Sequence, residues 1–255
     1  MTALQGVGLG LRLPHLDELQ TTATPPPWLE VLADNYLSPD GEGHAATHAL
    51  TQRLPTALHC VGMSVAGPEP LDEDYLARVA ELASHFGVAT VSDHLAFSRY
   101  DRAHLHDLLP IPYTPATLDH VARRVAHIQE RLQRPLLLEN ISCYVRPDTS
   151  HWRDLPFLGK LAELTGCGIL LDINNLYVNA VNFHDPMEDL VAEIPWQAVQ
   201  QIHIAGCADQ GGWLLDTHEG EPAAAVMELL TLCARQCPQA PVLLEWDRHL
   251  PPLSG

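Results

Sequence analysis

The sequence predicts an α/β fold, a TIM (β/α)8 barrel. Three observations support this prediction: short apolar runs alternate with longer amphipathic stretches, eight such runs occur, and 255 residues suit one closed barrel. Near-continuous apolar strands are typical of a parallel sheet that is buried on both faces. No linker or low-complexity run divides the chain, so we expect residues 1–255 to form a single domain.

The expected strands and helices alternate along the chain. The strands are expected at residues 6–11, 28–32, 56–62, 89–95, 135–140, 168–174, 200–206 and 240–246. Helical periodicity fills most of the gaps, at residues 72–86, 115–132, 154–165, 186–194 and 222–237. After the last strand only residues 247–255 remain, which is too few for a closing helix of ordinary length. We therefore expect the last helix to be short or missing.

Composition excludes several classes of protein. The 14 basic and 32 acidic residues give a net charge of −18, which disfavours nucleic acid or an anionic membrane as the partner. No apolar run approaches the length of a membrane span, and the N-terminus lacks the basic region of a signal peptide. The six cysteines form no CxxC motif and no dense framework, so we expect a reduced, cytoplasmic chain.

The first expected strand also argues against a dinucleotide-binding open sheet, the structural alternative to a barrel. Its glycines, Gly6, Gly8 and Gly10, do not have GxGxxG spacing that leads into a helix. The sequence therefore predicts no nucleotide cofactor. The 15 histidines instead outnumber the basic residues, and in an acidic protein this surplus suggests metal ligands.

Polar residues follow the apolar parts of six expected strands, as in LLLEN, ILLDIN and IHIAG. In a parallel barrel all of these strand ends face one rim, where active sites form. A single such residue can be explained as a buried polar group with a hydrogen-bond partner or as a helix cap. The pattern over all six strands cannot be explained in this way, because helix capping does not require histidine on three strands. The candidate metal ligands are His59, His94, Glu139, Asp172, Asn175, His203, Asp216, His218 and Glu245.

The donor types narrow the choice of metal. Imidazoles and carboxylates without thiolates suit iron, manganese or zinc, and they argue against calcium or a structural cysteine–zinc site. The donors outnumber what one ion needs, so we expect two or three metal ions with bridging carboxylates. Glu139 and Glu245 flank Asp172 and are the candidates for bridging. Open coordination positions would accept oxygen, hydroxide or a substrate atom.

At these residues the chain resembles the multinuclear non-heme iron-dependent oxidases, a family long catalogued as domain of unknown function 692. The matching segments span nearly the whole chain: GVGLGLR (6–12), WLEVLADNY (28–36), HCVGMS (59–64), SDHLAFS (92–98), LHDLLPIPYT (105–114), LLLENIS (136–142), LLDINNLYVNAVN (170–182), QIHIAG (201–206), DTH (216–218) and LLEWD (243–247). The resemblance implies a TIM barrel with two or three irons. It also implies oxygen-dependent modification of cysteines in a ribosomally made precursor peptide, which a partner protein presents.

The resemblance also implies roles for the candidate residues. One iron would be held by His59, His94 and Glu139, a second by Glu139, Asp172, His203 and Glu245, and a third by Asn175, Asp216 and His218. Zinc or manganese could substitute for iron. Asp93 and Asn140 are the candidate catalytic-site residues, expected to orient the ligands. The chain departs from the family pattern at Cys60, where glycine is usual, and in residues 181–186, so His184 is either an extra ligand or a loop residue.

Three other functions remain open on sequence grounds. An endonuclease IV-like phosphodiesterase shares the D-x-H motif, but it would carry a histidine three residues after the aspartate of the D-I-N-N motif. A xylose isomerase-like enzyme would need a catalytic lysine, yet Lys160 is the only lysine and falls in an expected helix. A non-catalytic metal-binding or peptide-presenting scaffold is the third alternative.

Overall fold

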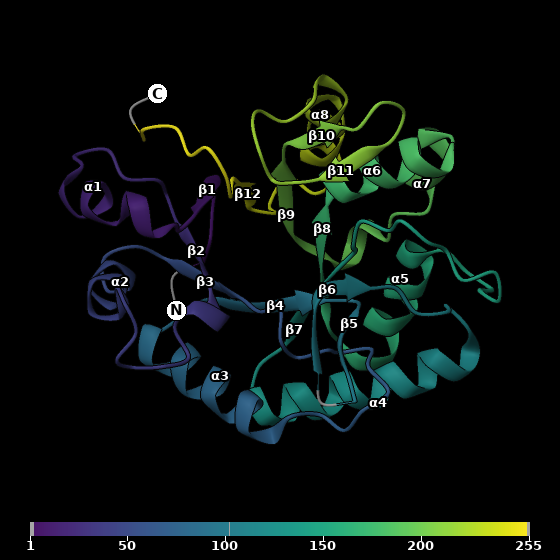
Figure 1. Cartoon of the computed structure of the whole chain (residues 1–255), viewed down its shortest axis with the longest axis horizontal. Coiled ribbons are helices and arrows are strands. Elements are labelled where there is room, and N and C mark those ends of the chain that lie inside the picture. Colours follow the sequence, from purple (N-terminus) through teal and green to yellow (C-terminus); the bar gives the residue numbers. More distant parts are fainter. Residues whose placement is uncertain (1–2, 102, 254–255) are drawn as a thin grey trace.

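The structure, a computed structural model, describes residues 3–101 and 103–253 and contains a closed barrel of eight parallel strands (Figure 1). The strand order around the barrel is β1-β12-β9-β8-β7-β4-β3-β2, and β1 closes the ring by pairing with β12. The predicted TIM barrel is confirmed. The strands are β1 (Val7–Gly10), β2 (Leu29–Leu32), β3 (Thr56–His59), β4 (Thr90–His94), β7 (Leu136–Glu139), β8 (Gly168–Asp172), β9 (Val199–Ala205) and β12 (Val242–Glu245).

Helices cover the outside of the barrel. They are α1 (Leu16–Thr21), α2 (His44–Thr51), α3 (Glu73–Phe86), α4 (Pro115–Leu132), α5 (Asp154–Thr165), α6 (Ile173–Phe183), α7 (Met187–Ala192) and α8 (Ala224–Gln236), with 3-10 turns at Leu13–His15, Ala33–Asn35 and Trp196–Ala198. The bounds of α4 and α5 match the sequence prediction. The Asp72 carboxylate caps α3 by accepting the Tyr75 N–H, and Thr114 forms a capping box that starts α4.

The core lies inside the barrel and between the strands and helices. Leu58, Leu138 and Leu171 are among the strand residues that are fully or almost fully buried. Trp28 is also fully buried and packs against Gly8 of β1. A Cβ at Gly8 would lie 2.3 Å from the Trp28 ring, so this contact requires glycine.

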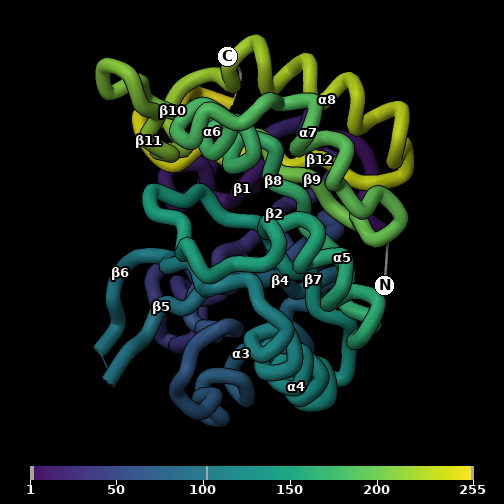
Figure 2. Tube along the Cα trace, turned by 90° about the vertical axis from the view of Figure 1, so that its right-hand side faces the viewer, coloured from purple at the N-terminus to yellow at the C-terminus, as the bar shows by residue number. Residues whose placement is uncertain are grey.

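Two hairpins that the sequence analysis did not predict follow the carboxyl ends of β4 and β9. The first pairs β5 (Phe97–Tyr100) with β6 (Ala103–Leu109), and the second pairs β10 (Cys207–Asp209) with β11 (Leu214–Asp216). Figure 2 shows both hairpins on the same side of the molecule. They therefore flank the rim where the polar strand ends meet.

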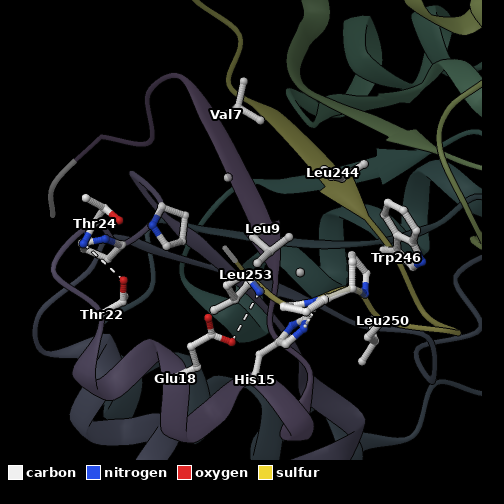
Figure 3. A pocket seen from close by; sticks show the side chains of 16 residues that line it. Val7, Leu9, His15, Glu18, Thr22, Thr24, Leu244, Trp246, Leu250 and Leu253 are labelled. Atoms are coloured by element: carbon white, nitrogen blue, oxygen red, sulfur yellow. Dashed lines mark hydrogen bonds between the residues drawn. The ribbon is translucent and has the colours of Figure 1, made fainter. Parts of the chain in front are cut away.

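No helix follows β12 within the described residues, as the sequence analysis expected. The segment after Glu245 instead runs back over α1 and the 3-10 turn before it, where the Pro251 carbonyl lies 2.8 Å from His15 Nε2. Together with the outer faces of β1 and β12 it lines a cavity of about 420 Å³ (Figure 3). Leu9, Leu244 and Trp246 contribute to its walls. In the described part of the chain, no helix has the length and apolar character needed to cross a bilayer.

Candidate metal centre

Six of the candidate ligands converge at the carboxyl rim of the barrel. Five are the last residues of their strands, and the sixth, His203, pairs in register with Asp172. The side chains come from six consecutive strands of the barrel and are almost completely buried: His59, His94, Glu139, Asp172, His203 and Glu245. Parallel strands in a closed barrel all end at one rim, which explains this convergence.

These residues form three overlapping groups that could each hold a metal ion. The groups are His59–His94–Glu139, Glu139–Asp172–His203 and Asp172–His218–Glu245, and within each group the ligand atoms lie within 4.8 Å of one another. Glu139 and Asp172 each belong to two groups. Clusters that share carboxylates are suited to several ions held close together, as the number of candidate ligands suggested.

The distances within the cluster leave room for cations between the donor atoms. Glu139 Oε2 lies 3.4 Å from His59 Nε2 and 3.5 Å from His94 Nε2. His203 Nδ1 lies 3.7 Å from Glu139 Oε1 and 3.4 Å from Glu245 Oε2. These separations are longer than good hydrogen bonds.

Several donor atoms at the rim have no hydrogen-bond partner among the described residues. Glu139 Oε2, Asp172 Oδ2 and His203 Nδ1 are buried and unpaired. A buried polar atom without a partner costs about 1–3 kcal/mol, and more when it is charged. Bound cations would satisfy these atoms, so the donor set fits a metal cluster.

Each buried histidine also has a neighbour on the side away from the cluster. His59 Nδ1 lies 2.7 Å from Ser92 Oγ, which leaves Nε2 toward Glu139. His94 Nδ1 lies 3.5 Å from the Asp93 carboxylate without a hydrogen bond, and its Nε2 is directed toward Glu139. A hydrogen-bonded partner such as Ser92 fixes the orientation of a metal-binding imidazole.

The two candidate catalytic-site residues, Asp93 and Asn140, mainly fix the backbone beside the ligands. The Asp93 carboxylate accepts the backbone N–H groups of Met63, at 3.0 Å, and His94, at 2.6 Å. The Asn140 amide donates to the Asp172 carbonyl at 2.8 Å and accepts the Asp172 N–H at 2.9 Å. Asn140 therefore fixes the end of β8, from which Asp172 projects.

The electrostatics reflect crowding of charge at the rim. Burial raises the pKa of Glu139, and repulsion from Glu245 adds to the effect. Burial and the nearby Glu139 raise the pKa of Asp172 well above its usual range. Burial lowers the pKa of His94, but Glu139 and Asp93 outweigh it and raise that pKa to about 9. Like charges brought together in a dry site favour neutralisation by protons or by cations.

His218, which the resemblance groups with Asn175 and Asp216, also converges with Asp172 and Glu245. His218 Nδ1 lies 3.4 Å from Glu245 Oε1, and the convergent group pairs His218 with Asp172 and Glu245. Asp216 lies 3.1 Å from His218 Nε2, but its carboxylate also accepts hydrogen bonds from Ser142 Oγ and Asn174 Nδ2.

Asn175 and His184 fall at opposite ends of α6. The Asn175 N–H donates to Asp172 Oδ1 at 2.7 Å, and its side-chain oxygen is buried with no hydrogen bond to a described residue. This oxygen is therefore available as a ligand atom. His184 is an exposed residue that caps the C-terminus of α6 in a left-handed conformation.

Sequence reasoning did not single out Glu30 and Arg12. Glu30 is buried in the middle of β2, and its carboxylate lies 3.2 Å from His203 Nε2. Arg12 follows β1 and donates to Asp247 at 2.8 Å, with a second contact to Glu245 at 3.5 Å. The sequence did contain a sign of the role of Glu30, because it is the one charged residue within the apolar run WLEVL.

The fold and the site define a TIM-barrel protein with a cluster of buried imidazole and carboxylate side chains at its carboxyl rim that could hold metal ions. Solved structures with similar folds include endonuclease IV from Thermus thermophilus (TM-score 0.61, 16% identity, 95% of this chain and 93% of that chain). A xylose isomerase domain protein from Planctomyces limnophilus is similar at a TM-score of 0.60 and 12% identity, covering 97% and 92% of the two chains. At these identities the likeness shows the fold alone.

The family follows from the sequence comparisons. The model described as "RiPP precursor modification enzyme MbnB/TglH/ChrH" matches residues 6–255, and the chain belongs to this family. A UPF0276 protein of Anaeromyxobacter sp. is 42% identical over 251 residues, covering 98% of this chain and 88% of its own length. A UPF0276 protein of Chromobacterium violaceum is 37% identical over 255 residues, covering 100% and 92%.

Proposed function

We propose that this protein is a multinuclear non-heme iron enzyme that uses oxygen to modify cysteine residues of a ribosomally made precursor peptide. The observation that carries the proposal is the run of three ligand groups in which Glu139 and Asp172 are shared. A single ion would not need this number of buried donors. Membership of a family that modifies peptide precursors supports the peptide as substrate.

The donor chemistry supports iron as the metal. The three groups contain only imidazole nitrogens and carboxylate oxygens, which suit iron and would also accept zinc or manganese. When bound, iron would supply a site for the substrate thiolate and a redox centre through which electrons lost by the cysteine pass to oxygen. The nine expected ligands, with Asn175 and Asp216 among them, remain our proposal for the residues that hold it.

The chain's own residues would organise this chemistry. Ser92 orients the ring of His59, Asp93 fixes the backbone at His94, and Asn140 fixes the backbone of Asp172. Burial of the cluster limits access of water, which strengthens the electrostatic interactions within it. Glu139 and Asp172 would lose their protons when cations bind, because coordinating carboxylates are ionised.

The surface beside the cluster supports a peptide substrate. Tyr144 and Trp213 are exposed, and their rings meet edge to face with centroids 5.9 Å apart. The Tyr144 hydroxyl accepts the N–H of Asp216, so this aromatic pair lies beside the candidate ligands. Aromatic side chains of this kind are common where proteins bind peptides. We propose that a partner protein presents the peptide to this face.

The test uses protein purified without oxygen, loaded with Fe²⁺ and mixed with a panel of cysteine-containing, ribosomally made precursor peptides. We expect oxygen uptake and a change in peptide mass that both require iron and the cysteine. The variant Asp172→Ala should lose iron and lower turnover about 100-fold or more, because it removes a shared donor. The exposed Asp148→Ala is the matched control and should retain both. Absence of iron-dependent oxygen uptake with every such peptide would refute the proposal.

A further inference from the structure

Glu30 is a buried carboxylate within a strand of the barrel. It sits in the middle of β2 between Leu29 and Val31, and only 4% of its surface is exposed. A buried carboxylate is costly unless it is paired with hydrogen-bond donors. Its contacts are with Gln201 Nε2, at 2.6 Å, and with His203 Nε2, at 3.2 Å.

These contacts cross the interior of the barrel. Glu30 belongs to β2, whose neighbours are β1 and β3, whereas Gln201 and His203 belong to β9, whose neighbours are β8 and β12. The carboxylate therefore reaches across the barrel to β9. Gln201 Oε1 lies 3.4 Å from the Thr90 hydroxyl on β4, which orients the Gln201 amide with its N–H group toward Glu30.

The two nitrogens of His203 consequently face different surroundings. Nε2 faces Glu30, while Nδ1 lies 3.4 Å from Glu245 Oε2 and has no hydrogen-bond partner among the described residues. His59 shows the opposite arrangement, because its Nδ1 faces Ser92 and its Nε2 faces the cluster. In each case the hydrogen-bond partner on the side away from the cluster determines which ring nitrogen faces the cluster.

We propose that Glu30 is a positioning residue that accepts the Nε2–H of His203 and so presents Nδ1 to the metal cluster. The inference rests on the proposed metal centre. A metal-binding histidine commonly donates its second N–H to a carboxylate, which fixes both the tautomer and the ring orientation. The alternative is that the Gln201 amide donates to an unprotonated Nε2, at 3.1 Å, which would place the proton on Nδ1.

The first test measures the tautomer directly in the wild-type protein. Zn²⁺ is used as a diamagnetic probe, and long-range ¹H–¹⁵N NMR spectra of histidine side chains are assigned by comparison with His203→Gln. We expect His203 to carry its proton on Nε2 and to bind zinc through Nδ1. Coordination through Nε2, or a His203 that binds no zinc while the other cluster histidines do, would overturn the inference.

The second test measures zinc binding by the variants Glu30→Ala and Glu30→Gln at equilibrium. Glu30→Ala should weaken one class of site about 10- to 100-fold and leave the sites that use His59 and His94 intact. Glu30→Gln retains an accepting oxygen and should restore most of the affinity. Ser92→Ala, which removes the partner of His59, is the matched control and should weaken a different site.

Zinc binding by the wild-type protein and by Glu30→Ala also separates this inference from the proposed function. Wild-type binding in Glu30→Ala would overturn the role of Glu30 and leave the metal centre standing. A wild-type protein that binds no metal would instead overturn the metal centre, and the role of Glu30 with it.

Discussion

Glu139 and Asp172 are the residues on which the candidate site depends most. Each is shared between two ligand groups, and both are buried among other carboxylates. Burial and the neighbouring carboxylates raise the pKa of both residues. A raised pKa means that a proton is held more tightly, so a cation that binds at neutral pH must displace protons.

This competition predicts that metal binding strengthens as pH rises. His94, with a pKa of about 9, must also lose its proton to act as a ligand. We expect the affinity for Co²⁺ to rise between pH 6 and pH 9 by about tenfold per pH unit for each proton displaced. Competition with a chelator at several pH values measures this slope. An affinity that does not change over this range would contradict the ionisation scheme.

Most of the residues at the rim could be predicted because an isolated polar residue at the end of an apolar strand is conspicuous. Six such residues were expected to converge, and the structure brings them together. Glu30 was missed because it lies in the middle of its strand, where a side chain enters the barrel below the rim. The grouping around His218 depends on how the β10–β11 hairpin folds back, which strand periodicity does not encode.

At the scale of elements, the loop after β3 is held in place by a buried arginine on α4. Arg124 donates to the backbone carbonyls of Val65 at 2.7 Å, Ser64 at 2.9 Å and Glu69 at 2.7 Å. The loop begins directly after His59. Arg124 therefore connects the outer helix layer to a segment that adjoins the candidate site.

Replacing Arg124 with methionine should destabilise the protein by about 2–3 kcal/mol, because three carbonyls would lose a charged donor. Urea denaturation followed by circular dichroism gives the free energy of unfolding. Arg123→Met, an exposed change on the same helix, is the control and should alter that free energy by less than about 0.5 kcal/mol. Equal effects of the two substitutions would argue against this role for Arg124.

The elements with strong local signals were predicted accurately, and those without them were not. Helix α4 has Pro115 at its start after the capping residue Thr114, and α5 ends at Gly166 in a left-handed conformation. Helix α6 was missed because its sequence, INNLYVNAVNF, contains several asparagines with low helix propensity. Hydrogen bonds to other segments compensate for this low helix propensity. Asn179 accepts the N–H of Cys143 and donates to the Ile141 carbonyl. The two hairpins were missed because their strands are short or mostly exposed: β10 and β11 have three residues each, and most of β6 is exposed.

At the scale of the whole molecule, the closed barrel gathers side chains that are far apart in sequence. His59 and Glu245 are separated by most of the chain, yet both take part in one cluster because every strand ends at the same rim. Strand count and alternation were enough to predict this architecture. The β1–β12 closure holds without a helix after β12 in the described residues, because β1 pairs with β12 in regular parallel register.

The central claim is that several ions share one buried set of donors. Mössbauer spectroscopy of protein loaded anaerobically with ⁵⁷Fe²⁺ and then partly oxidised, combined with metal analysis, tests it most directly. We predict two or three irons per chain and spectra that show magnetic coupling between neighbouring irons. One uncoupled iron per chain, or a chain that retains only zinc, would contradict the account.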